Sequence, residues 1–366
     1  MRHLIVCFLF SFVKLSLAAN ILCIFPKPAF SHQKVFRSVT EGLLNRGHRI
    51  TLLTTHPSET EKQHANITLI DVSFSSEIFQ ETLDKAYESK SIKEALFQII
   101  DDDAALVDMQ LSSEGFQKLL NNKLESFDLL FLETSGASPF HALAEIFKVP
   151  IVGITSSDAF SVVHGMMGNE NNAIAHPDRL LHFTMAKTFL QRLGSCAFNL
   201  MIRIFILPRS EQNFDALLRK HFPSVEKSHA ELLKNVDLLF INAHPAFGFI
   251  RPILPNTIPL GFLHVKPPSP LPDDLKELLD NSKHGAIFMS FGTIVTSKLA
   301  HKSFESFMKA FTDLPYNIFW KYDGEIPDQV PTNIHFRKWF PQSDLLAHPN
   351  VRLFITQGVS ENIQIN

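Results

Sequence analysis

The chain has 366 residues, of which 45% are hydrophobic and 19% are charged, enough apolar material at this length for two domain cores. Its net charge of −3 and its 17 histidines are spread along the chain without a basic stripe. Nucleic-acid-binding proteins cluster Lys and Arg to neutralise phosphates, so this composition argues against that class of function.

The first 19 residues read as a targeting segment. Arg2 and His3 precede an apolar stretch over residues 4–17, and small residues lead to Ala19. The stretch contains Lys14 and is shorter than the roughly 20 apolar residues that span a bilayer. We therefore favour a signal peptide over residues 1–19 rather than a transmembrane helix, and we expect the chain in the secretory pathway, in the lumen of the endoplasmic reticulum.

The cysteines and a glycosylation signal are consistent with that compartment. Cys7 would leave with the signal peptide, and Cys23 and Cys196 are too few for a disulfide framework. The sequence Asn66-Ile67-Thr68 is an acceptor for N-glycosylation and indicates a surface loop.

The chain after the signal peptide opens with a βαβ pattern. We expect strands over 20–25 and 49–54, and between them a helix that ends at Gly47 and carries Val35, Val39 and Leu43 on one face. Strands joined by such a crossover run parallel.

The alternation of strand and helix continues to about residue 242. The expected elements are a helical stretch over 87–100, a strand over 127–133, a helix over 139–147, and strands over 150–155 and 238–241. This pattern predicts a doubly wound α/β domain over residues 20–242. Residues 189–207 are markedly apolar but contain Arg192 and Arg203, so we favour a buried helix there, with a membrane-facing amphipathic helix as the alternative.

A proline-rich segment over 243–282 predicts a linker, because such a run sustains neither helix nor central strand. The alternation then restarts and predicts a second α/β domain over residues 283–366. Its expected elements are strands over 286–290, 317–321, 335–339 and 351–356 and a helix over 304–311.

Two residues fall at the sheet edge where open α/β folds bind ligands. His32 lies where the first strand gives way to the first helix, and Glu133 ends the strand over 127–133. The positive end of the helix dipole disfavours a protonated imidazole, so His32 could take up a proton, and Glu133 could orient the ring. On pattern alone, a helix cap and a solvated strand-end carboxylate remain the simpler interpretations.

Motifs along nearly the whole chain resemble the UDP-glycosyltransferase family, in particular the animal glucuronosyltransferase branch and its insect relatives. They are Ser31-His32 after a Pro turn, residues 127–133, His244-Pro245, Ser290-Phe-Gly-Thr293 and the block from Trp339 to Gly358. The last block is the most specific, because no structural need alone assembles its Trp-x-Pro-Gln, Asp-Leu-Leu-x-His-Pro and Phe-Ile-Thr-Gln-Gly segments in that order.

The resemblance implies two facing Rossmann-like domains, the GT-B type, with the second domain incomplete. It implies transfer of glucuronic acid or glucose from UDP to a hydroxyl of a small lipophilic acceptor, a reaction associated with detoxification. In that reaction His32 is the base that deprotonates the acceptor, with inversion at the anomeric carbon. Glu133 stands where many relatives have an Asp that supports the histidine.

The resemblance also assigns the UDP-sugar site. Trp339 stacks on uracil, Gln342 contacts the nucleoside, and Ser290, Gly292 and Thr293 line the phosphates. Gln357 and Gly358 begin the diphosphate-binding turn, where a Gly-rich loop meets a helix N-terminus. The family pattern needs no metal or other cofactor, since the UDP-sugar is a co-substrate.

The sequence departs from the family after this turn. Val359 replaces an expected glycine, and the β-branched side chain disfavours the backbone conformation that glycine allows. The sugar-reading residues and the membrane anchor of full-length relatives have no counterpart in the 366 residues, so we expect this polypeptide alone to be weakly active or inactive. Two alternatives to an enzyme follow: a shortened, non-catalytic form that binds acceptor or pairs with full-length relatives as a homo- or hetero-oligomer, and a secreted carrier of hydrophobic ligands.

Overall fold

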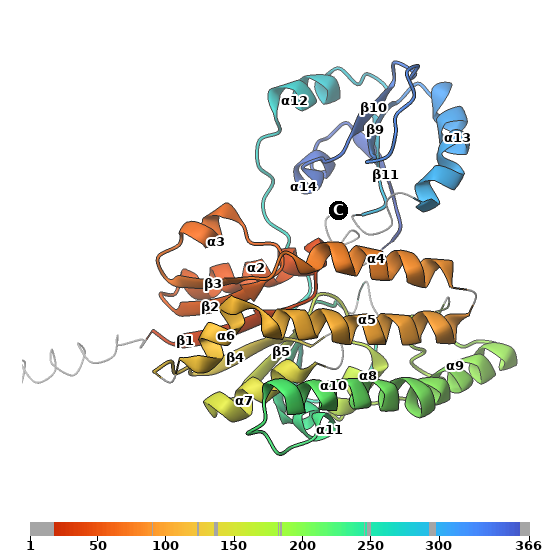
Figure 1. Ribbon diagram of the computed structural model, residues 1–366. Helices are drawn as coiled ribbons and strands as arrows, with labels where there is room; N and C mark the ends of the chain where they lie inside the picture. The colour runs from red at the N-terminus through yellow and green to blue at the C-terminus, as the bar shows by residue number, and fades with distance from the viewer. Residues whose placement is uncertain are drawn as a thin grey trace, which may run out of the picture.

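The chain folds into two domains, each built on a parallel β-sheet (Figure 1). The computed structural model describes residues 18–89, 91–122, 124–134, 138–181, 183, 185–244, 246, 250–292 and 298–358. The signal-peptide prediction for residues 1–19 therefore falls almost wholly outside the described residues.

The first sheet has the strand order β3-β2-β1-β4-β5-β6-β7, and every neighbouring pair is parallel. The order reverses at β1, which places a topological switch point between β1 and β4. The strands are β1 (Asn20–Phe25), β2 (Arg49–Thr54), β3 (Ile67–Asp71), β4 (Leu129–Glu133), β5 (Ile151–Thr155), β6 (Val236–Ile241) and β7 (Thr257–Pro259).

Helices cover this sheet, and α2 follows β1 directly. The α-helices of the domain are α2 (Phe30–Leu44), α3 (Glu59–Gln63), α4 (Ser75–Glu88), α5 (Ile92–Ser112), α6 (Glu114–Asn121), α7 (Ala142–Phe147), α8 (Ser161–Met166), α9 (Phe189–Met201), α10 (Leu207–His221) and α11 (His229–Leu232). Short 3-10 turns lie at Pro139–His141 and Leu233–Asn235, and a π-helical turn, η3 (Ile202–Ile206), joins α9 to α10. Local chemistry sets several of these ends: the Ser58 and Glu61 side chains form a capping box that begins α3.

The second sheet has the order β10-β9-β8-β11 and is also parallel. Its strands are β8 (Ala286–Ser290), β9 (Asn317–Lys321), β10 (Ile334–Arg337) and β11 (Val351–Thr356), and its helices are α12 (Asp273–Asp280), α13 (Lys298–Thr312) and α14 (Gln342–Leu346). Among the described strands, β11 is at one edge of this sheet, and its Leu353 is half-exposed.

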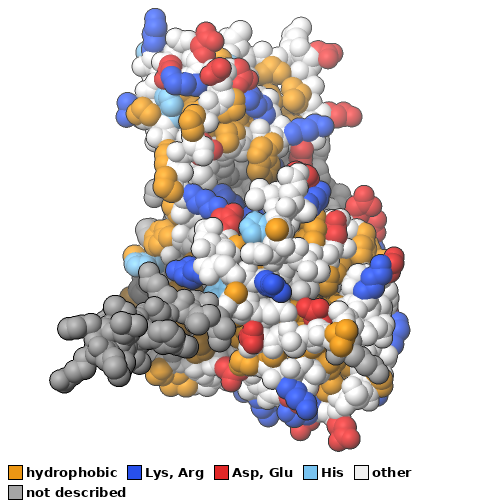
Figure 2. Space-filling view, turned by 90° about the vertical axis from the view of Figure 1, so that its left-hand side faces the viewer, with side chains coloured by type: hydrophobic (Ala, Val, Ile, Leu, Met, Phe, Trp, Pro, Cys, Tyr) orange, Lys and Arg blue, Asp and Glu red, His pale blue; other side chains and the backbone are white. Residues whose placement is uncertain are grey.

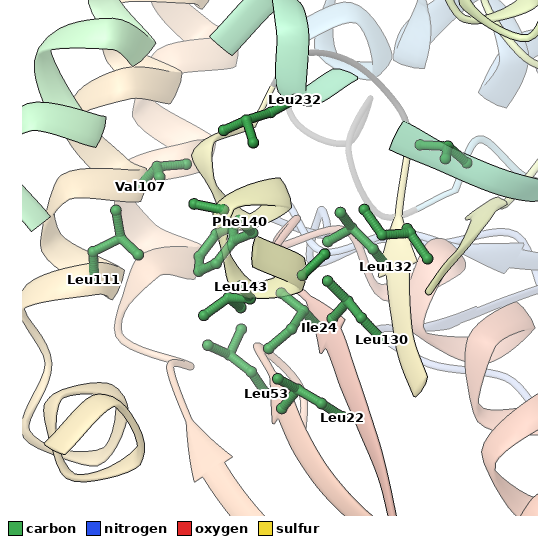
Figure 3. Packing of buried hydrophobic residues seen from close by; sticks show 14 of the residues in the cluster. Leu22, Ile24, Leu53, Val107, Leu111, Leu130, Leu132, Phe140, Leu143 and Leu232 are labelled. Carbon is green, nitrogen blue, oxygen red and sulfur yellow. The ribbon is translucent and has the colours of Figure 1, made fainter. Parts of the chain in front are cut away.

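The larger core lies between the first sheet and the helices on one of its faces. Figure 3 shows Leu22, Ile24, Leu53, Leu130 and Leu132 projecting from neighbouring strands toward Phe140 and Leu143, with Val107, Leu111 and Leu232 beyond them. All of these side chains are less than 5% exposed. Each such aliphatic side chain contributes about 1.5–3 kcal/mol when fully buried, so the strands are held mainly by their apolar runs.

The sequence predicts most strands closely. The strands over 20–25, 49–54, 286–290, 317–321 and 351–356 are confirmed with the expected bounds. The strand expected over 335–339 ends at Arg337, so Trp339 lies in the following loop. The expected helix over 87–100 is two helices, because the chain leaves the helical path between α4 and α5. The sequence analysis missed β3.

Two expectations need correction. The apolar segment 189–207 is helical, but it is not a buried helix: in α9 only Ser195 is buried, and Phe189 and Leu190 are each 75% exposed. The proline-rich segment holds more regular structure than a linker, since β7 pairs with β6 at the sheet edge and α12 begins after its last proline. An edge position accommodates Pro259, which cannot donate a ladder hydrogen bond.

The two domains touch through α2 and the start of α14, and the linker adds a contact to α2. Lys34 Nζ donates to Ser343 Oγ at 3.1 Å, and the Lys266 ammonium lies 2.5 Å from the Glu41 carboxylate. Figure 2 shows this junction as a narrower region between the two domains, and Lys, Arg, Asp and Glu side chains are interspersed over the visible face. That face carries no uniform basic surface.

Candidate active site

The turn between β1 and α2 is held by buried amide side chains. Gln33 Nε2 donates to the carbonyls of Phe25 and Lys27 at 3.0 Å each, and the Thr54 hydroxyl donates to Gln33 Oε1 at 2.8 Å. Gln110 Nε2 donates to the Pro26 carbonyl at 2.7 Å. These bonds satisfy the polar backbone of the turn and fix the position from which α2 starts.

The structure brings His32 and Glu133 together at this turn. His32 is in the first turn of α2, and its Nδ1 lies 2.7 Å from Glu133 Oε1, although the two residues are 101 positions apart. A carboxylate only accepts, so Nδ1 carries a proton and donates it, and in the neutral imidazole the lone pair is then on Nε2. The His32 side chain is 26% exposed, whereas that of Glu133 is 1% exposed. The pair therefore has an inner carboxylate and an outer, solvent-reaching imidazole.

Lys27 also contacts the carboxylate of Glu133. Its backbone N–H donates to Glu133 Oε2 at 3.1 Å, and its ammonium is 2.7 Å from Asp103 Oδ1 on α5. Burial by itself would lower the pKa of Lys27, but the ion pair with Asp103 and the field of Glu133 outweigh it and raise the pKa. A fixed positive charge thus stands close to the buried Glu133, where an unpaired carboxylate would be costly.

Replacing Lys27 by Met should slow any reaction that uses His32 as a base. The change removes the cation near Glu133 and leaves Asp103 unpaired, so we expect kcat to fall about three- to tenfold, the effect of a partly buried ion pair worth about 1 kcal/mol. The KM for the nucleotide substrate should stay the same, and Lys27→Arg should restore the rate. Steady-state kinetics would measure this, and an unchanged kcat in Lys27→Met would contradict the positioning role.

Trp339 lies at the junction of the domains. Trp339 is 55% exposed. Its ring packs edge to face against that of Phe30, the first residue of α2, with 5.3 Å between the ring centroids. Phe30 is two positions before His32, so an aromatic contact links the second domain to the turn that carries the histidine. Gln342, the second nucleoside-site residue expected from sequence, begins α14 nearby.

The expected phosphate-site residues gather at the carboxyl ends of β8 and β11, which are neighbouring strands. Ser290 ends β8 and is buried, and its Oγ accepts from the Gly292 N–H at 3.4 Å. Gly292 has φ of 83°, a conformation that favours glycine, and a Cβ there would displace the Gln357 amide. Gly358 also has a positive φ, 75°, and open space around it. Thr293 and Val359 lie outside the described residues.

Lys321 is a site residue that sequence reasoning missed. It ends β9, beside β8, and its Nζ donates to the Gly292 carbonyl at 3.0 Å. Burial lowers the pKa of Lys321, partly offset by the nearby Asp323. A cation beside the Ser290–Gly292 turn suits a diphosphate. The sequence did place Lys321 at the end of a predicted strand, and that position could have identified it. Lys27 could not be identified in this way, because its partner Asp103 is remote in sequence.

One other expectation concerns the surface. Asn66 is exposed in the turn before β3, where a glycan could be attached. Within the described part of the chain, no group of three His, Cys, Asp or Glu side chains is arranged to hold a metal ion.

Comparison with curated proteins places this arrangement in a known family. The model of the family described as "UDP-glucoronosyl and UDP-glucosyl transferase" matches residues 20–364. "UDP-glucosyltransferase 2" of Dactylopius coccus is 29% identical over 342 residues, covering 93% of this chain and 66% of that protein. "UDP-glucuronosyltransferase 3A1" of Homo sapiens is 30% identical over 387 residues, covering 98% of this chain and 70% of that protein. The chain thus spans about two-thirds of the length of these relatives.

Solved structures with the same fold are glycosyltransferases of the GT-B type. CalG4, the calicheamicin glycosyltransferase, superposes with a TM-score of 0.55 at 17% identity, covering 95% of this chain and 77% of that chain. Arabidopsis thaliana UGT89C1 complexed with UDP gives a TM-score of 0.54 at 15% identity, with the same coverage. At these identities the likeness shows the fold alone. The family match covers the described strands of both sheets, and the chain belongs to the UDP-glucuronosyl and UDP-glucosyl transferase family.

Proposed function

We propose that this chain transfers a glycosyl group from a UDP-sugar to a hydroxyl of a small lipophilic acceptor, with His32 as the base. The observation that carries the proposal is the 2.7 Å bond between His32 Nδ1 and the buried Glu133 carboxylate. It sets the tautomer in which His32 Nε2 can accept a proton. The family match to UDP-sugar transferases supports this assignment.

The proposed reaction is a single displacement. His32 Nε2 takes the proton of the acceptor hydroxyl as its oxygen attacks the anomeric carbon. The bond from that carbon to the diphosphate breaks, the electron pair leaves with UDP, and the configuration at the carbon inverts. Glu133 stabilises the imidazolium that forms, and the Lys27 N–H keeps the carboxylate in place.

The donor is proposed to bind at the carboxyl edge of the second sheet. Trp339 would stack on uracil, and Gln342 would contact the nucleoside. Ser290, Gly292 and Thr293, with Gln357 and Gly358, would receive the diphosphate, and Lys321 would supply positive charge beside them. In this scheme the UDP-sugar is a co-substrate, and neither metal nor other cofactor takes part.

The proposal covers the cellular setting as well. The segment over residues 1–19 would direct the chain to the lumen of the endoplasmic reticulum, and pairing with longer relatives would be its mode of assembly. The relatives include proteins named as glucosyltransferases and as glucuronosyltransferases, so UDP-glucose and UDP-glucuronic acid are both candidate donors.

A direct test gives the purified chain UDP-glucose or UDP-glucuronic acid together with a set of lipophilic phenols and alcohols. Since we expect the chain alone to be weakly active, mass spectrometry should detect a slowly formed glycoside of the acceptor, and nuclear magnetic resonance should show the inverted anomeric configuration. Binding of UDP without transfer from either donor would instead favour a non-catalytic nucleotide-binding role. A retained configuration would rule out the single displacement.

A further inference from the structure

One side of α2 faces the second domain (Figure 1). Phe30 and Lys34 are four residues apart in this helix, so their side chains project from the same side, one turn apart. Phe30 packs on the ring of Trp339, and Lys34 Nζ donates to Ser343 Oγ. His32 lies between them in sequence and projects from the opposite side, toward the end of β4. The first turn of α2 therefore carries the candidate base on one side and the contact with the second domain on the other.

Trp339 is held in place chiefly from the first domain. It lies in the loop after β10 and is 55% exposed, and among the described residues Phe30 supplies the only aromatic ring that packs against it. A half-exposed indole in a loop loses conformational freedom when a base stacks on it, and that loss weakens binding. A contact that already holds the ring removes part of the loss before the nucleotide arrives. Phe30 therefore prepares Trp339 for a stacked base.

Phe30 is itself anchored in the first domain. Its second ring neighbour is His56, just after β2, with 5.9 Å between the ring centroids and 74° between the planes. His56 Nδ1 lies 2.9 Å from the Thr55 hydroxyl, and that hydroxyl donates to the Lys27 carbonyl at 3.1 Å. Arg37 of α2 donates to the His56 carbonyl at 2.8 Å. The rings thus form a row that starts at the end of β2 and reaches the loop after β10.

A second contact from α2 reaches the start of α14. Lys34 Nζ donates to Ser343 Oγ at 3.1 Å, beside Gln342, the other proposed nucleoside contact. The next residue, Asp344, accepts from a backbone N–H of the linker at 2.7 Å. Both proposed nucleoside contacts, Trp339 and Gln342, are therefore steadied by groups outside the second sheet.

The exposure of Trp339 distinguishes this contact from ordinary packing. Trp320, the other tryptophan of the chain, is 1% exposed and packs against Phe304 and Phe336. Trp339 keeps more than half of its surface open although Phe30 packs on it. A ring that is held at one side and open at another suits a platform on which a base stacks.

We propose that Phe30 is a positioning residue of the nucleotide site, through which the first domain holds the Trp339 indole in the orientation that stacks on uracil. Lys34 assists by fixing the start of α14. This inference rests on the proposed function and deepens it, because the affinity for UDP then depends on both domains. Since Phe30 and His32 share one helical turn, the position of the nucleotide is also set relative to the base.

The test is a double-mutant cycle on the affinity for UDP, measured by calorimetry with the full chain. Phe30→Ala should weaken UDP binding about three- to tenfold, the range expected for one aromatic pair. In a Trp339→Ala background the same substitution should change the affinity less than about twofold, because it acts through the indole. Phe30→Tyr keeps the ring and should bind UDP like the unchanged chain. Lys34→Met should weaken binding about threefold, through the loss of one hydrogen bond.

Two controls separate positioning from general destabilisation. Phe189→Ala truncates a phenylalanine of α9 that is 75% exposed, and it should leave the affinity for UDP unchanged. Acrylamide quenches the fluorescence of exposed tryptophan, and Trp320 is buried, so quenching reports mainly on Trp339. Without UDP, Phe30→Ala should increase the quenching and Phe30→Tyr should not.

The outcomes that contradict the inference differ from those that contradict the proposed function. Equal affinities of Phe30→Ala and the unchanged chain for UDP would overturn the positioning role and leave the nucleotide site in place. The same loss of affinity with and without Trp339 would also overturn it, because Phe30 would then not act through the indole. If the unchanged chain does not bind UDP, the nucleotide site itself is wrong and this inference falls with it.

Discussion

Replacing His32 by Gln is expected to lower the rate of sugar transfer by roughly 10²–10⁴-fold, the usual contribution of a positioned general base. Gln can keep a hydrogen bond to Glu133, but it cannot accept the acceptor proton. Transfer would be followed as glycoside formed per enzyme at saturating UDP-sugar, so that a slow variant can be compared with the unchanged chain.

The control for this variant is its affinity for UDP, which should not change, because the proposed nucleotide contacts lie in the second domain. A transfer rate within about threefold of that of the unchanged chain would show that His32 is not the base. In that case the His32–Glu133 pair would be a structural feature of the β1–α2 turn.

Mild acid should destabilise the first domain through two buried histidines. His141 is 1% exposed and His229 is 0% exposed. They lie in the 3-10 turn Pro139–His141 and in α11, which contact each other and α10. Burial lowers the pKa of His141 to about 4, although its ring also bonds the Ser138 carbonyl. Burial, and then the proximity of His141, lowers the pKa of His229 to about 3.

The sign of the effect follows from proton uptake. The unfolded chain binds protons at these histidines near pH 6.5, whereas the folded chain does not bind them until about pH 4 and about pH 3. The contribution of the two histidines to the free energy of unfolding is therefore fully present above pH 7, and it falls as the pH drops below 6.5. At pH 5 the free energy of unfolding is lower by about 2 kcal/mol for each histidine. This is a large part of the 5–15 kcal/mol that is typical of folded proteins.

The variant His229→Leu removes one of these groups. Urea unfolding at pH 7 and at pH 5 should show that the loss of unfolding free energy between the two values is about 2 kcal/mol smaller than in the unchanged chain. His284→Leu changes an exposed histidine and should leave the pH dependence as it was. If both variants lose as much stability as the unchanged chain, His229 titrates normally in the folded state.

Much of the fold could be predicted because its strands are buried apolar runs with clear ends. Such runs are typical of parallel sheets covered on both faces, and β1, β2, β8, β9 and β11 have the expected bounds. β3 was missed since only one of its five residues is buried, and β7 was missed because it consists of three residues that include a proline. The exposed side of α9 could not be predicted, because an apolar sequence does not say whether protein or another medium covers it.

The candidate site was predictable where it depends on strand ends. Residues at the carboxyl ends of parallel strands meet at one edge, so His32 and Glu133 could be placed together from sequence. The Lys27–Asp103 ion pair and the Phe30–Trp339 contact depend on how helices and domains pack. Those contacts join residues that no local pattern connects.

The nucleotide site is the part of the account on which the transferase assignment depends most. Isothermal calorimetry of the chain with UDP tests it, with Trp339→Ala as the matched variant. We expect saturable binding that Trp339→Ala weakens about 5- to 150-fold, the worth of a base stacked on an aromatic ring, while the variant stays folded. Absence of UDP binding by the folded, unchanged chain would contradict the account, because the carboxyl edge of the second sheet would then not be a nucleotide site.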